Sequence, residues 1–155
     1  MSAIATPPVT LELDAARQFD FWLGDWDCTW HADGLEHVGT NSVYADLGGA
    51  VIVENFDGRP SLDFQGLSFS VYDRTAGCWK QTWVDSEGSY LDFAGGYENG
   101  VMELRRAGEA DGAPALFRMR FEHIEPNAFD WSWQRSGDDG HTWTSLWEIE
   151  YRRVV

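Results

Sequence analysis

Hydrophobic and polar positions alternate with a period of two in short runs along most of the chain, which is the pattern of β-strands with two different faces. From Phe21 onward these runs recur about every ten residues and are separated by Gly, Asp or Asn. The pattern predicts strands in simple succession. Their expected ranges are 22–31, 35–45, 49–57, 64–73, 78–84, 88–97, 100–106, 115–124, 128–136 and 142–153.

The connections between these runs favour hairpins, because segments such as Asp33-Gly34 and Asn99-Gly100 supply residues that tolerate positive φ. The segment 107–115 has no apolar periodicity and is expected to form an extended hairpin loop. A long antiparallel sheet usually closes on itself to remove its edges. The sequence therefore predicts an all-β fold, an antiparallel up-and-down barrel of about ten strands.

Before the strands, Leu11, Ala15 and Phe19 recur every four residues and predict one short N-terminal helix or lid. Residues 1–10, which include Pro7-Pro8, are expected to be a flexible lead. The length of 155 residues fits a single domain, 1–155, that is large enough to bury a core.

Nine tryptophans change this picture from a plain barrel to a barrel with an aromatic interior. Trp79 and Trp83 share one strand face, and so do Trp131 and Trp133, because alternate side chains of a strand point to the same side. These four indoles are the expected walls of a cavity for a small, mainly apolar ligand.

The charge of the chain limits its partners. There are 26 acidic and 11 basic residues, which give a formal net charge of −15. Such a surface repels phosphate backbones and anionic membranes, so neither nucleic acid nor membrane is expected as a partner. No leader sequence and no long apolar run is present, so the cytoplasm is the expected location. Cys28 and Cys78 are expected to be buried free thiols.

Polar residues within the apolar patterns are the candidates for chemistry. Gln81 lies between Trp79 and Trp83 on the inner face, where it either belongs to a satisfied core network or binds a ligand. Glu54 shares a face with Ile52 and Phe56. Such a setting raises the pKa of a carboxyl group, so Glu54 is either an acid–base catalyst or half of a buried Glu–Arg pair.

The strand 115–124 can face either way. If its arginines face solvent, they only cover the surface; if the cavity is polar, Arg118 or Arg120 would bind a ligand carboxylate with two hydrogen bonds. His123 is the histidine best placed for acid–base work or haem ligation. No spacing typical of a metal site occurs, and no nucleophile or phosphate-binding motif is found. Neither a metal nor another cofactor is therefore expected.

Residues 136–143, Ser-Gly-Asp-Asp-Gly-His-Thr-Trp, resemble the Asp-box of sialidases and other β-propellers. That resemblance implies a structural role for Ser136, Asp138, Gly140 and Trp143, in which the Ser and Asp side chains close the turn. Because propellers repeat the motif and it occurs once here, a propeller is not expected.

Phe21-Trp22-Leu23-Gly24-Asp25-Trp26 resembles the Gly-x-Trp opening of calycins, which include lipocalin and nitrobindin barrels. Together with Leu47-Gly48-Gly49, Gly66-Leu67-Ser68, Tyr72-Asp73 and 79–85, it makes nearly the whole chain resemble bacterial calycin-like proteins. The resemblance implies that Trp26 plugs the closed end of the barrel, but it implies no activity. Nitrobindin-type barrels ligate haem through a histidine near the C-terminal end, a position that His123 does not clearly match.

Three hypotheses of function follow from the residues. The first is binding of a small apolar molecule with one polar or carboxylate group by Trp79, Trp83, Trp131, Trp133, Gln81 and Arg118. The second is an isomerase, lyase or hydratase of a small aromatic or lipid-like metabolite that uses Glu54 or His123 as the acid–base group and Arg118 as the anchor for the substrate. The third is a structural or homodimer module without a ligand.

Overall fold

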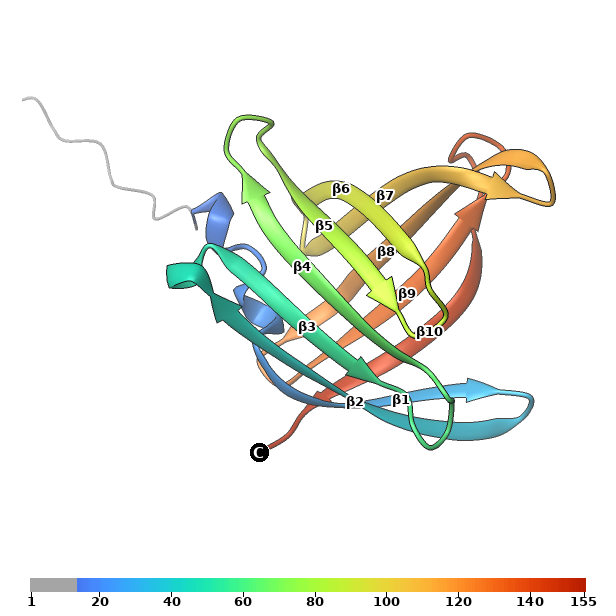
Figure 1. The fold of residues 1–155 in the computed structure, drawn as a ribbon, viewed down its shortest axis with the longest axis horizontal. Coiled ribbons are helices and arrows are strands. Elements are labelled where there is room, and N and C mark those ends of the chain that lie inside the picture. The colour runs from blue at the N-terminus through green and yellow to red at the C-terminus, as the bar shows by residue number, and fades with distance from the viewer. Residues whose placement is uncertain (1–13) are drawn as a thin grey trace, which may run out of the picture.

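The computed structural model describes residues 14–155, which form a closed antiparallel barrel of ten strands in up-and-down order (Figure 1). The predicted fold class is therefore confirmed. The strands are β1 (Gly24–Ala32), β2 (Leu35–Asp46), β3 (Val51–Asp57), β4 (Gln65–Asp73), β5 (Cys78–Asp85), β6 (Tyr90–Glu98), β7 (Val101–Ala110), β8 (Ala113–Glu125), β9 (Ala128–Ser136) and β10 (Thr144–Arg153).

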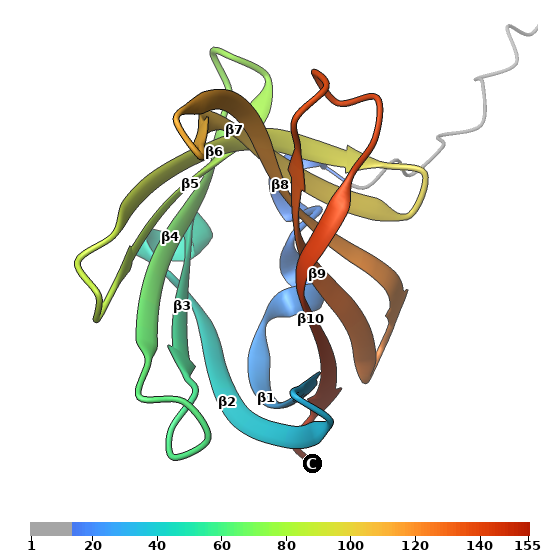
Figure 2. The same ribbon diagram turned by 90° about the vertical axis from the view of Figure 1, so that its right-hand side faces the viewer.

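Each strand pairs with the next one along the chain, and β1 pairs with β10 to close the ring. The ring is visible in Figure 2, where the blue segment that begins at residue 14 and leads into β1 lies inside it at the far end. The turns β1–β2, β3–β4, β5–β6, β7–β8 and β9–β10 belong to the opposite end, because consecutive strands run in opposite directions. The turns β2–β3, β4–β5, β6–β7 and β8–β9 lie at the same end as the chain that enters β1.

The expected loop at 107–115 is wrong. Strands β7 and β8 stay paired up to Ala110 and Ala113, and only Asp111 and Gly112 form the turn, with φ of 53° and 77°. Small and polar residues in this hairpin hide its alternation. Here the ladder of backbone hydrogen bonds, which a side-chain pattern does not report, extends the strands.

The predicted short N-terminal helix is present as two 3₁₀ turns, η1 (Ala15–Arg17) and η2 (Asp20–Trp22), while Leu11 and the proposed lead lie outside the described residues. A third turn, η3 (Leu47–Gly49), joins β2 to β3. Phe19 and Trp22 are 0% and 1% exposed, and the Phe19 ring lies 5.2 Å from that of Trp79. The N-terminal turns therefore fill one end of the barrel with aromatic side chains.

Trp26 and Arg153 lock this closed end. The Trp26 indole donates to the carbonyl of Trp22 at 2.8 Å, and the Arg153 guanidinium lies 4.3 Å from the Trp26 ring centroid. Arg153 also donates to the carbonyls of Leu23 (2.6 Å) and Phe21 (3.3 Å). At Gly24, φ is 131°, a backbone conformation that favours glycine, and a Cβ would lie 2.3 Å from Arg153 Nη1 and displace this guanidinium.

The turn 136–143 is closed by its own side chains. Ser136 Oγ accepts from the Gly140 amide at 2.9 Å, and Asp138 accepts from the Thr142 amide and hydroxyl at 2.8 and 2.6 Å. The bonds from Thr142 and Ser136 hold the pKa of Asp138 well below its usual range. The turn needs no ligand to be ordered.

Cys28 is a buried free thiol and Cys78 a half-buried one. Among residues 14–155, no helix is long and apolar enough to cross a membrane.

Removal of the Trp26 indole should destabilise the barrel more than any exposed aromatic substitution. We expect Trp26→Ala to lower the free energy of unfolding by about 3–5 kcal/mol, because a large side chain at 1% exposure leaves a cavity. Trp26→Phe, which loses mainly the bond to the Trp22 carbonyl, should cost about 1–2 kcal/mol. Urea denaturation measures both. Tyr90→Ala is the control, since Tyr90 is 70% exposed and should cost less than about 1 kcal/mol; equal losses at Trp26 and Tyr90 would contradict the locking role.

Candidate functional site

A cavity of about 320 Å³ lies inside the barrel, beyond the aromatic side chains of the closed end. Its wall is mostly apolar and includes the indoles of Trp83, Trp131, Trp133 and Trp147. Trp22 forms part of the wall toward the closed end, and Glu87, which is exposed, lies at the other limit. The cavity is therefore continuous with solvent near the β5–β6 turn.

Strand β4 makes room for this cavity because its inner face carries small residues, Gly66, Ser68 and Ser70. The Trp83 indole packs directly against Gly66, where a Cβ would lie 2.0 Å from Trp83 Cη2. The two serines instead serve as hydrogen-bond partners for larger polar side chains on the neighbouring strands. The small residues of β4 thus leave space for the polar side chains of Glu54 on β3 and Gln81 on β5.

Glu54 on β3 is 6% exposed and lies in the cavity wall. Its carboxyl group accepts hydrogen bonds from Ser68 Oγ at 2.7 Å and from Asn41 Nδ2 at 2.6 Å. Asn41 also donates to Tyr151 Oη at 3.1 Å. Burial raises the pKa of Glu54 to about 7, although the bonds from Ser68 and Asn41 act in the opposite direction. Near neutral pH this carboxyl group can hold or release a proton.

The neighbours of Glu54 do not titrate in the same range. Burial raises the pKa of the Cys28 thiol and of the Tyr151 phenol well above their usual values. Asn41 and Ser68 carry no charge. Glu54 is therefore the group of this network that changes charge near neutrality.

Gln81 on β5 is 3% exposed and its amide nitrogen donates to Ser70 Oγ at 2.9 Å. Its Oε1 atom has no hydrogen-bond partner among residues 14–155. Leaving a buried acceptor unpaired costs about 1–3 kcal/mol. One of the two alternatives for Gln81 was a core network that satisfies its hydrogen bonds. This network pairs the amide nitrogen but leaves the amide oxygen without a partner.

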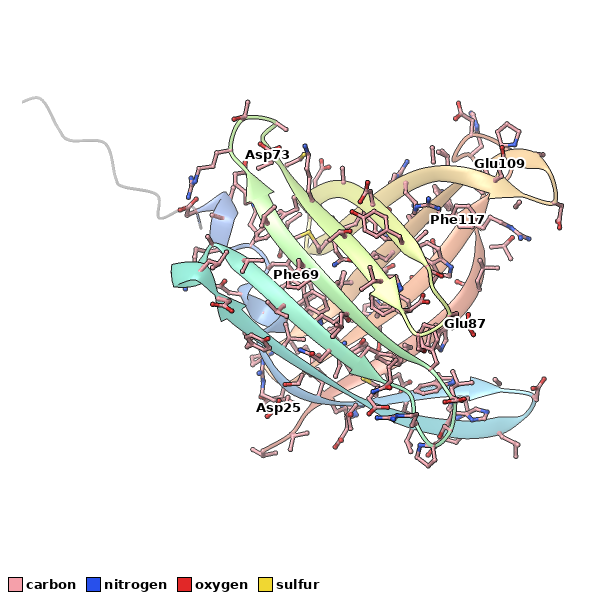
Figure 3. All side chains as sticks on the ribbon, viewed as in Figure 1. Asp25, Phe69, Asp73, Glu87, Glu109 and Phe117 are labelled. Atoms are coloured by element: carbon pink, nitrogen blue, oxygen red, sulfur yellow. The ribbon has the colours of Figure 1, made fainter. Side chains whose placement is uncertain are left out.

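The mouth of the cavity is acidic. Asp85 accepts from Trp83 Nε1 at 2.9 Å and from the Glu87 amide at 3.0 Å, and the Glu87 side chain extends from the turn (Figure 3). Among the described residues that line the cavity, Glu54, Asp85 and Glu87 carry carboxyl groups, and none is Lys, Arg or His.

The structure brings together five of the predicted site residues, Glu54, Gln81, Trp83, Trp131 and Trp133. Trp79 does not join them. It is 2% exposed, donates to the carbonyl of Ala15 at 3.2 Å and packs in the closed end, so its expected place in the cavity wall is wrong.

Of the two orientations open for the strand 115–124, the inward one, with Arg118 or Arg120 as a ligand-binding residue, is wrong. Met119 and Phe121 face the cavity, so both arginines face outward. Arg118 donates to Gln134 at 2.6 Å, pairs with Glu103 at 2.9 Å and lies 4.0 Å from the Trp143 ring centroid. The alternative of a surface role is the one that the structure supports.

His123 also lies outside the barrel. Its side chain is 75% exposed and its Nδ1 is 2.7 Å from Asp130 Oδ2. Glu54, in turn, has no arginine partner, so the expected buried Glu–Arg pair is not formed. Among residues 14–155 no histidine lines the cavity, so no described side chain is placed to ligate haem iron there.

Three residues of the site network were missed, Asn41, Trp147 and Tyr151. The alternation Trp147, Ile149, Tyr151 in β10 carried a usable signal, since all three line the cavity. The inward arginines were missed as well. Arg106 and Arg135 are the register partners of Phe117 on β7 and β9. Each lies two residues beyond an inward side chain, Leu104 or Trp133, and so is on the same inner face.

No group of three or more His, Cys, Asp or Glu side chains that could hold a metal ion occurs within residues 14–155. No protein-family model matches the chain, and no curated protein matches it.

The raised pKa of Glu54 predicts a pH-dependent stability difference between wild type and Glu54→Gln. The folded protein keeps this proton up to pH 7 or so while the unfolded chain loses it near 4.5, so wild-type stability falls as pH rises through this window. Relative to wild type, the variant should therefore gain about 2–3 kcal/mol between about pH 5 and pH 8. Urea titrations at several pH values measure this difference. Parallel curves for the two proteins would show that Glu54 is not perturbed.

Proposed function

We propose that the barrel binds a small, mainly apolar molecule that carries one polar group. The observation that carries this proposal is the cavity of about 320 Å³, walled by indoles and containing the buried polar side chains of Glu54 and Gln81. Ligand sites are concave, mostly apolar and fitted with a few placed polar groups. The unpaired Oε1 of Gln81 supports the proposal, because a ligand donor would satisfy it.

Glu54 favours a second candidate, an isomerase, lyase or hydratase. A general acid–base group works best when its pKa lies near the operating pH. Glu54 has a pKa of about 7 and lies in the cavity wall, where a bound substrate would be within reach. His123 and Arg118 have no part in this candidate, since both lie outside the barrel.

The hypothesis of a homodimer has a defined surface. Leu67, Phe69 and Val71 on the outer face of β4 are 43%, 47% and 40% exposed (Phe69 is labelled in Figure 3). A contiguous apolar face of this kind is where a second copy would pack. The molecular mass from size-exclusion chromatography with light scattering tests it.

We also propose kinship with the calycins. The closed barrel and the Gly24–Trp26–Arg153 lock support it, since Trp26 fills the end of the barrel that the Gly-x-Trp resemblance implies.

A substitution at Gly66 should weaken ligand binding without touching a polar group. Gly66→Ala places a methyl group where the Trp83 indole lies, so the indole must move and the cavity must change shape. We expect binding of 2-(1-naphthyl)ethanol to weaken about tenfold or more by isothermal titration calorimetry.

The matched control is Gly96→Ala, where an added Cβ meets nothing within 4 Å and which should bind as wild type does. Native mass spectrometry of the purified protein supplies an independent search for a retained ligand. The absence of any retained ligand, together with no binding of naphthyl or indolyl compounds, would overturn the proposed function.

A further inference from the structure

We propose that the ligand of the cavity is a cation, a protonated amine on an aromatic or aliphatic body, which Glu54 and Gln81 bind inside while Asp85 and Glu87 attract it at the mouth. The inference rests on the proposed function and names the charge of its ligand. It replaces the carboxylate ligand that an inward Arg118 would have required.

The first support is the charge of the cavity wall. Its titratable residues among residues 14–155 are Glu54, Asp85, Glu87 and Tyr151, and no basic side chain lies among them. The formal net charge of −15 gives the whole molecule the same sign. An anionic ligand would enter against this field, whereas a cationic one would be drawn toward it.

The second support is the state of the buried polar groups. Glu54 has two neutral hydrogen-bond donors, Ser68 and Asn41, but no cation beside it. A buried carboxylate is expensive without a counter-charge. Gln81 Oε1, in a side chain that is 3% exposed, lacks a donor. An ammonium group has three N–H donors and a positive charge, and so supplies what both residues lack.

The placement of these two groups allows one ligand head to reach them. Glu54 is paired with Ser68 across β3 and β4, and Gln81 with Ser70 across β4 and β5. The two long side chains therefore flank the same small-residue strand from opposite sides. The short serines between them leave the space that a head group needs.

The third support is the aromatic wall. Trp83, Trp131, Trp133 and Trp147 line the cavity, and the face of a tryptophan ring attracts cations. The same indoles pack against an apolar body. A ligand with an ammonium head and an aromatic body matches both properties of this wall.

Two kinds of group favour an anion or a neutral hydrogen-bond acceptor instead. The first are the indole Nε1 donors of Trp22 and Trp147, which line the cavity and have no partner among residues 14–155. The second are Arg106 and Arg135 on the inner face of β7 and β9, next to Phe117 and outside the set of residues that line the cavity. The Arg106 guanidinium is 6.0 Å from the Phe117 ring centroid, and its Nη1 lies 2.9 Å from where a Gly108 Cβ would be. It therefore extends along β7 toward the hairpin tip, away from Leu104 and the cavity.

Three naphthyl compounds of nearly equal size separate these alternatives: 2-(1-naphthyl)ethylamine, 2-(1-naphthyl)ethanol and 3-(1-naphthyl)propionate. Isothermal titration calorimetry at about pH 8, where Glu54 is mostly ionised, should give the amine about tenfold tighter binding than the alcohol. The propionate should bind more weakly than the alcohol. Added salt should weaken binding of the amine and leave the affinity for the alcohol nearly unchanged.

Single substitutions locate the effect. Glu54→Gln should weaken binding of the amine about tenfold and change the affinity for the alcohol less than about threefold, because only the amine is attracted by the charge of Glu54. Glu87→Gln should weaken the amine by about two- to threefold, since this carboxylate is exposed and screened. Glu109→Gln is the control of equal net charge. Glu109 lies in the β7–β8 hairpin, apart from Glu87 (Figure 3), and its loss should leave all three affinities unchanged.

Each outcome decides a different question. Equal binding of the amine and the alcohol overturns the cation inference and leaves the proposed function standing. Tightest binding of the propionate also overturns it, because the preferred ligand is then an anion. If Glu54→Gln does not fold, the ranking of the three compounds on the wild-type protein and on Glu87→Gln still decides. No binding of any of the three contradicts the proposed function itself.

Discussion

The pairing of β1 with β10 is the constraint on which the rest of the structure depends. Once the sheet is closed, every inward side chain of ten strands faces the same interior, and no strand edge is left for another chain to extend. The interior must then be filled from within. At the closed end, Phe19, Trp22 and Trp26 fill the interior. Arg153 donates to the carbonyl of Leu23 and so fixes the chain where it enters β1. The cavity exists because the same filling is not repeated toward the other end.

The difference between the two ends comes from the size of inward residues on β4. Gly66, Ser68 and Ser70 contribute almost no volume, whereas the strands on the opposite side contribute Trp131, Trp133 and Trp147. Large side chains on one side and small ones on the other leave an asymmetric space. Two of its polar groups, Glu54 and Gln81, lie beside the small residues, where Ser68 and Ser70 provide their hydroxyl partners.

The sequence predicted the barrel well because alternation and turn residues act locally and agree over the whole chain. It predicted the inner positions of β3 and β5 for the same reason. It left β8 open, because Phe117, Met119 and Phe121 alternate with Arg118 and Arg120 and either face could serve a polar interior; only the ligand-binding role of Arg118 is wrong. Trp79 shares a face with Trp83, but distance along the barrel axis, which alternation does not encode, places it in the closed end. The network of Asn41, Glu54 and Tyr151 joins the consecutive strands β2 and β3 to β10, 110 residues beyond Asn41, so the part of Tyr151 in it required the fold.

Glu54 is the point where stability and the proposed function oppose each other. Its raised pKa means that the ionised carboxyl group destabilises the fold above neutrality, although Ser68 and Asn41 both stabilise that charge. A fold optimised for stability alone would have an apolar residue at position 54, or an arginine beside Glu54 that pairs with it. Neither is present, and the acidic groups at the mouth add no counter-charge. The missing positive charge must then come from solvent protons or from a bound molecule, and the indoles around the cavity are suited to the second.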